Sequence, residues 1–272
     1  MTAFATVVRY AIQESVRRRV FLVVLVLSIS FAAVYTAGAA AIFGGLNDFD
    51  TGEGERAAVG TGLLGFAMFV VLFLGTTLAI FLTIGTVRGD AERGLLQPLV
   101  VRPVGRTRFL GARLAAAAGM SSGYVLGFFV VLVMLTAAVG QWFPDSLLGA
   151  AFGLVGAVLV VCLLSLLGST FLTATANGIA VFMLFGAGLA AALLHQLALG
   201  LDSGALKAVS ELAGWLLPFM ALYLSALGSL GPDVDTADIL GGPSGLALVL
   251  WTLVYLGLLA AGARAVFLRR DL

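Results

Sequence analysis

The stretch AAVGTGLLGFAMFVVLFLGTTLAIFLTIGTV, residues 57–87, contains no Asp, Glu, Lys or Arg. About 20 apolar residues suffice for a helix to cross a hydrocarbon layer roughly 30 Å thick, so this segment predicts a transmembrane helix. The rest of the chain is similar, because 61% of its 272 residues are hydrophobic and 11% are charged. An ordinary soluble domain has about 25% charged residues, so the composition excludes a soluble protein.

Five further runs of span length also lack charged residues. Together they predict an all-α integral membrane fold, in which residues 1–272 form a single transmembrane domain with six membrane-spanning helices. The expected spans cover residues 20–43, 57–87, 114–139, 146–171, 176–199 and 245–263. The third carries small residues at Ala115, Gly119, Gly123 and Gly127, a spacing that lets another helix of this chain or of a partner approach closely.

The arginines predict the orientation, because Lys and Arg are retained on the cytoplasmic side of a membrane. Thirteen arginines precede the first span, lie between the second and third, or follow the sixth. With four acids they give that side a charge of +9, whereas Arg56, Lys207 and ten acids give the other side −8. We therefore expect a multi-pass protein of the cell inner (plasma) membrane with both termini in the cytoplasm.

Residues 200–244 contain a further apolar stretch, WLLPFMALYLSALGSL at 215–230, which resembles a seventh span. A crossing there would place the acidic segment 231–242 in the cytoplasm and the Arg264 tail outside, against the arginine rule. The stretch is also short and contains Pro218. We expect a re-entrant or surface-lying hairpin on the outer side, preceded by an amphipathic helix near 205–213.

Residues 2–19 separate an apolar face, with Phe4, Val7 and Ile12, from a polar face with Arg9 and Arg17. This pattern predicts an interfacial helix on the membrane surface. A simple hydrophilic leader is the alternative.

Several chemical activities are excluded or disfavoured. Lys207, the only lysine, lies outside any phosphate-binding loop motif, so we expect no ATPase or other enzyme activity and no cofactor in this chain. His195 is the only titratable side chain in a span other than Cys and Tyr; we expect it to be packed rather than a proton relay, because no carboxylate is near it in sequence. The overall charge of +1 predicts no nucleic-acid partner. Serine-hydrolase-like fragments at 119–123 and 242–245 are weak matches, and a lone cysteine, Cys162, cannot form an internal disulfide.

The cytoplasmic segment RGDAERGLLQPLVVRPVGRTRFLGAR, residues 88–113, combines charges, prolines and exposed leucines. Two acids suit the N-terminal end of a short helix, and the helix should stop before Pro103. Exposed leucines beside arginines indicate a docking element for another protein, and a solvated loop with incidental leucines is the alternative. The candidate docking residues are Asp90, Glu92, Arg93, Gly94, Leu95, Leu96, Pro98, Leu99, Arg102, Pro103 and Arg106.

This segment resembles the loop between the second and third spans of permeases of the ABC-2 type. That family has E-x-E-x-G-T-L, then P-V-x-R and a later G-K, and the matching residues here are Asp90, Glu92, Gly94, Leu96, Pro103, Val104, Arg106 and Gly111. Asp90 replaces the first Glu, Leu95 replaces the Thr and Ala112 replaces the Lys. The interfacial helix, the six spans and the outer hairpin extend the resemblance over the whole chain.

The resemblance implies a transmembrane exporter subunit that pairs with a second permease copy or a homologous permease. It also implies a cytoplasmic coupling helix in 88–113 that docks a separate ATPase subunit, which would bind ATP and Mg. Thr76, Thr77, Thr83, Ser165, Ser169 and Asn177 could line a polar path, although the substrate is not readable from the sequence. A membrane-anchored scaffold or assembly protein that recruits another cytoplasmic partner is the alternative from a different class.

Overall fold

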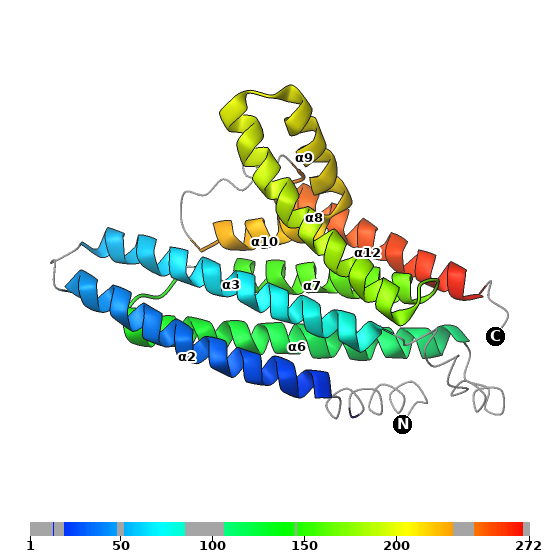
Figure 1. Cartoon of the computed structure of the whole chain (residues 1–272), viewed down its shortest axis with the longest axis horizontal. Helices are drawn as coiled ribbons and strands as arrows, with labels where there is room; N and C mark the ends of the chain where they lie inside the picture. Colours follow the sequence, from blue (N-terminus) through cyan, green and yellow to red (C-terminus); the bar gives the residue numbers. More distant parts are fainter. Residues whose placement is uncertain are drawn as a thin grey trace.

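The computed structural model describes residues 13, 19–47, 52–84, 106–144, 146–230 and 242–268. Within these ranges the chain forms eight helices and no strand (Figure 1). They are α2 Arg19–Asn47, α3 Glu53–Thr83, α6 Arg106–Gly140, α7 Leu147–Ser169, α8 Ala174–Leu201, α9 Gly204–Leu216, α10 Pro218–Gly228 and α12 Gly245–Leu268. All except α9 and α10 are long and apolar enough to cross a membrane, which confirms an all-α fold with six candidate spans.

The helices α3 and α7 form the centre of the bundle. In α3, 67% of the most apolar window is buried, compared with 17% in α2, which packs only at the edge against α3 and α6. The buried side chains of the core include Leu64, Met68 and Leu72 of α3 and Leu154 and Val158 of α7. Many apolar side chains of α2, α8 and α12 remain exposed, as lipid-facing helices require.

The helix α8 crosses the bundle obliquely and joins α9 in a hairpin that projects from the other helices (Figure 1). The next helix, α10, lies inside the bundle against α7. Its first seven residues, Pro218–Leu224, are all buried. The region predicted as one outer hairpin therefore has two different halves, a projecting α9 and an enclosed α10.

Several helices extend beyond the apolar runs that predicted them. The helix α6 begins at Arg106, eight residues before the predicted span 114–139, so the last eight residues of the segment 88–113 are helical. Backbone hydrogen bonding continues outside hydrocarbon, whereas the charge-free criterion places the boundary at the last arginine. Conversely, α3 ends at Thr83 and Ile84 is extended, although the apolar run continues to Val87. The predicted interfacial helix at 2–19 lies outside the described residues except for Gln13 and Arg19.

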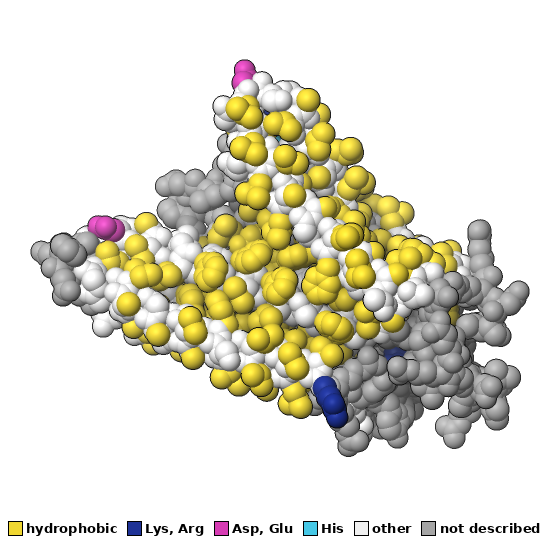
Figure 2. Space-filling model, viewed as in Figure 1, with side chains coloured by type: hydrophobic (Ala, Val, Ile, Leu, Met, Phe, Trp, Pro, Cys, Tyr) yellow, Lys and Arg dark blue, Asp and Glu magenta, His cyan; other side chains and the backbone are white. Residues whose placement is uncertain are grey.

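The described charges gather at the ends of the helices (Figure 2). Arginine atoms appear where α2 begins, and acidic atoms appear where α3 begins and at the tip of the α8–α9 hairpin. The starts of α2 and α6 and the ends of α3 and α12 lie at one end of the bundle (Figure 1). We call it the basic end, because its described charged residues are Arg19, Arg106, Arg108, Arg113 and Arg264.

Candidate functional site

The predicted docking residues from Asp90 to Pro103 lie outside the described residues, and Arg106 is the first residue of α6. The helices on either side of this segment are described. The end of α3 and the start of α6 both lie at the basic end of the bundle (Figure 1). The structure therefore shows the helix ends from which residues 85–105 extend, and a polar cluster lies among the helices there.

The cluster joins three helices through Thr83 of α3, Ser165 of α7 and Asn177 of α8, and all three side chains are fully buried. The Thr83 hydroxyl lies 2.7 Å from the Ser165 hydroxyl, and it also lies 2.8 Å from the Ala79 carbonyl oxygen of its own helix. The Asn177 amide Nδ2 donates to the Ser165 carbonyl oxygen at 2.9 Å and lies 3.3 Å from the Ser165 hydroxyl. Polar contacts between helices favour one fixed arrangement in an apolar medium, so the cluster fixes α3 and α8 on α7.

Close helix packing encloses the cluster. The Asn177 Oδ1 atom is buried without a hydrogen-bond partner among the described residues and lies against Gly168 of α7, where a side chain would collide with it. The Thr76 hydroxyl, two turns before Thr83 in α3, is also buried, and no residue that the structure describes forms a hydrogen bond with it. An unpaired buried polar group costs about 1–3 kcal/mol, so these two atoms are unusual in a packed interior.

The predicted polar path is only partly assembled. Thr83, Ser165 and Asn177 come together, whereas Thr77 and Ser169 bond to carbonyls of their own helices, those of Phe73 at 2.8 Å and Leu166 at 2.7 Å. A hydroxyl bonded to its own helix is satisfied without a neighbour. The six residues therefore separate into a three-helix cluster, two hydroxyls satisfied within their own helices, and Thr76, whose hydroxyl has no hydrogen-bond partner among the described residues.

Two hydrogen bonds that sequence reasoning missed hold α2 on α6. The Ser28 and Tyr124 hydroxyls lie 2.6 Å apart, and the Tyr35 and Thr136 hydroxyls are also 2.6 Å apart. The sequence did show hydroxyl side chains in both apolar spans, Ser28 and Tyr35 in α2 and Tyr124 and Thr136 in α6. Pairing them requires the register between the helices, which the sequence does not state.

The α9–α10 pair bends by 94° between Leu216 and Pro218. Pro218 occupies the first turn of α10, where its missing N–H costs no helical hydrogen bond. The helix α12 pairs with carbonyls at the end of α9: Trp251 Nε1 donates to the Trp215 carbonyl at 2.9 Å, and the Tyr255 hydroxyl donates to the Leu216 carbonyl at 2.8 Å. Two side-chain hydrogen-bond donors of α12 therefore hold the bend.

His195 of α8 is packed, as expected from the sequence. Its side chain is 2% exposed, and Nδ1 lies 2.9 Å from the Ser210 hydroxyl of α9. That hydroxyl donates to the Lys207 carbonyl at 2.8 Å, so it accepts from Nδ1–H of His195. The pair connects the two arms of the α8–α9 hairpin.

The small-residue face of α6 is open. A methyl group added at Gly119, Gly123 or Gly127 would have no neighbour within 4 Å among the described residues. At Gly153 of α7, by contrast, it would lie 2.6 Å from the Leu222 carbonyl oxygen of α10. The sequence left open whether a helix of this chain or a helix of a partner packs on this face. No described helix of this chain does so.

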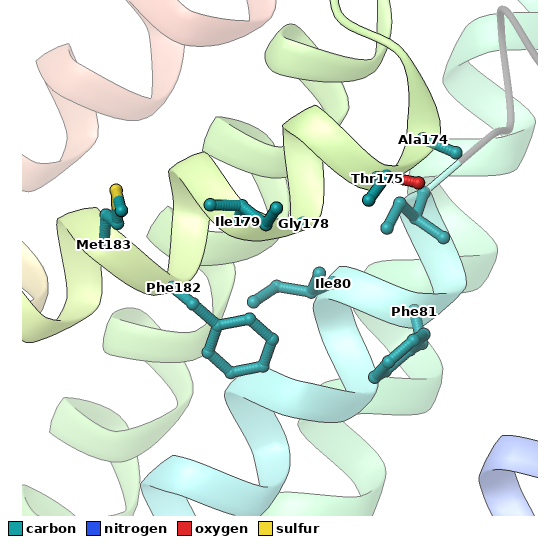
Figure 3. A pocket seen from close by; sticks show the side chains of 9 residues that line it. Ile80, Phe81, Ala174, Thr175, Gly178, Ile179, Phe182 and Met183 are labelled. Carbon is teal, nitrogen blue, oxygen red and sulfur yellow. The ribbon is translucent and has the colours of Figure 1, made fainter.

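A groove separates the end of α3 from the start of α8 (Figure 3). Its volume is about 600 Å³, and its lining residues are Ile80, Phe81, Ile84, Ala174, Thr175, Gly178, Ile179, Phe182 and Met183. Ile80 and Phe182 point toward each other across the gap in Figure 3. Thr175 is the one lining side chain with a hydrogen-bonding group.

No protein-family model matches the chain, and no curated protein matches it significantly. Its function must therefore be argued from its own residues and their arrangement.

Proposed function

We propose that this chain is the transmembrane permease subunit of an ATP-binding cassette exporter of the ABC-2 type. The pattern of charges, prolines and leucines in 88–113 carries the proposal. Support comes from the flanking helices, since the end of α3 and the start of α6 both lie at the basic end of a bundle with six candidate spans. The energy source would be a separate ATPase subunit, which binds ATP and Mg and docks on this segment.

The polar cluster supplies a route for coupling. A push on the segment after Ile84 displaces the end of α3, and Thr83 is bonded to Ser165 of α7, which also holds Asn177 of α8. Moving α3 alone would break the 2.7 Å hydrogen bond between Thr83 and Ser165, so the cluster favours a joint movement of the three helix ends. Such a rigid-body shift changes access to a path between this permease and a second copy. The open α6 face offers that copy a surface for close helix packing.

Docking is tested by co-purification with an ATP-binding cassette ATPase, chosen from the reading frame next to this one. Leu96→Asp and Arg106→Glu should each abolish ATPase co-purification and ATP-dependent transport. Lys207→Glu reverses a charge on the exposed α9 surface and should change neither. An adjacent frame without an ATPase, or normal binding and transport by both docking variants, would favour the scaffold alternative.

We further propose that the basic end faces the cytoplasm. Thirteen arginines lie in the parts of the sequence that precede α2, join α3 to α6 or follow α12, or in the helix ends beside them, and such arginines are retained inside. Cys162 is fully buried, so replacing it by alanine gives a background for single cysteines. In intact cells an impermeant thiol reagent should label Asp202→Cys and spare Arg264→Cys; the reverse labelling would invert the orientation.

The α9–α10 pair is proposed as a re-entrant hairpin. Its bend is held by Trp251 and Tyr255, which lie six and ten residues after the start of α12 at Gly245. At 1.5 Å per residue the bend is about 9–15 Å from that helix end, within the thickness of the hydrocarbon layer. Non-helical backbone is tolerated at such depth when protein groups satisfy it, and here two side chains do so. The pair would thus enter and leave the membrane on one side.

A further inference from the structure

The groove between α3 and α8 has the shape of a site for a chain-like ligand. Along α8 it extends from Ala174 to Met183, which is about 14 Å at 1.5 Å per residue. Half of a hydrocarbon layer roughly 30 Å thick is about 15 Å, the depth of one leaflet. The groove therefore extends no further than the acyl region of a single leaflet is deep.

Two residues keep the floor of the groove open and apolar. Ile80 of α3 is fully buried beneath it, and Gly178 of α8 is buried opposite. A methyl group at position 178 would lie 2.9 Å from Ile84 Cδ1, so a larger residue would fill this part of the floor. The upper walls carry side chains that are exposed in the bundle, with Ile179 at 53% and Met183 at 70%.

The charge around the groove indicates the head group of the ligand. The groove lies beside the last turn of α3 and the first turns of α8, at the basic end. The charged residues described at that end are all arginines, and none of the described residues there is acidic. Arginines at a membrane surface attract anionic lipid head groups, by about 1 kcal/mol each.

We propose that the groove binds an anionic phospholipid from the leaflet at the basic end, with one acyl chain lying between α3 and α8. Ile179, Phe182 and Met183 contact the chain, and the arginine-rich end holds the head group. The site goes beyond the proposed transport function, because lipid binding here requires neither an ATPase nor a cargo.

Native mass spectrometry of the purified full chain tests the proposal. Phosphatidylglycerol and phosphatidylcholine with identical acyl chains are added in equal amounts, and the bound lipid is counted. We expect about fivefold more phosphatidylglycerol than phosphatidylcholine, the preference that one arginine near the head group provides.

Two variants place a large apolar side chain in the groove, Ile179→Trp in its middle and Met183→Trp at its inner end. Each should remove the bound phosphatidylglycerol. Leu193→Trp makes the same type of change on α8 outside the groove, at a side chain that is 69% exposed, and should retain the lipid. Equal binding of the two lipids, or unchanged binding in both groove variants, would overturn the proposal. Because two groove variants are used, poor folding of one leaves the other as the test.

Discussion

Replacing Tyr255 by phenylalanine removes one hydroxyl and leaves the ring in place. The hydroxyl donates to the Leu216 carbonyl at 2.8 Å, where the chain turns from α9 into α10. Hydrogen bonds between helices in a membrane contribute about 0.6 kcal/mol on average and up to about 1.7. A carbonyl left unpaired away from water costs about 1–3 kcal/mol. If the bend lies in the membrane, Tyr255→Phe should therefore lower the free energy of unfolding by about 1–2 kcal/mol.

The expected loss is much smaller if the bend lies in water. A water molecule can then replace the hydroxyl, and surface substitutions usually change stability by less than about 0.5 kcal/mol. The size of the loss thus distinguishes a re-entrant hairpin from a surface-lying one. Trp251→Phe provides a second measurement at the same bend, since its indole N–H donates to the Trp215 carbonyl.

The measurement is reversible unfolding in lipid bicelles, compared between each variant and the parent. Leu253→Ala is the control, because that side chain of α12 is 61% exposed in the bundle. Both bend variants should lose more stability than this control. A loss below about 0.5 kcal/mol in Tyr255→Phe, with Trp251→Phe no worse than the control, would refute the placement of the bend in the membrane.

Three further predictions concern helix packing. Gly153→Val should destabilise the protein by about 1–3 kcal/mol in the same assay, because its Cβ atom would lie 2.6 Å from the Leu222 carbonyl oxygen. An unchanged free energy of unfolding would contradict the α7–α10 contact. Gly123→Val should leave the unfolding free energy within about 0.5 kcal/mol but weaken self-association in a crosslinking assay if a second copy packs on α6; unchanged crosslinking would count against that interface. Thr83→Val keeps the shape of the side chain and should cost about 0.6–1.7 kcal/mol through its lost bond to Ser165, whereas Thr77→Val, whose hydroxyl donates to the Phe73 carbonyl of the same helix, should cost less.

The candidate site was only partly predictable. The sequence identified Thr83, Ser165 and Asn177 as polar residues in apolar spans. It did not distinguish them from Thr77 and Ser169, which were candidates for the same polar path. Their difference depends on which side of each helix faces a neighbour, and a helix that is apolar all round carries no periodic signal for that side. The groove was not predicted either, because it arises from the divergence of α3 and α8, two helices far apart in the chain.

Pro218 shows what a local rule does establish. It predicted an interruption in 215–230, and the structure has a 94° bend there. It did not predict that α10 lies inside the bundle or that Trp251 and Tyr255 hold the end of α9. Those contacts join residues more than 30 positions apart, and no local pattern encodes them.

The sequence by itself determined that this protein has six long apolar helices, where each lies in the chain and which connections carry the arginines. These features follow from the free energy of transferring each segment from water to an apolar medium, which depends on the residues of that segment alone. The tertiary structure decided which helices are central, which glycines are in contact, how the three polar residues meet and where a groove remains open. Those features depend on the close fit of side chains between helices. Because the spans are apolar on all sides, their sequences do not show which side of each span packs against a neighbour.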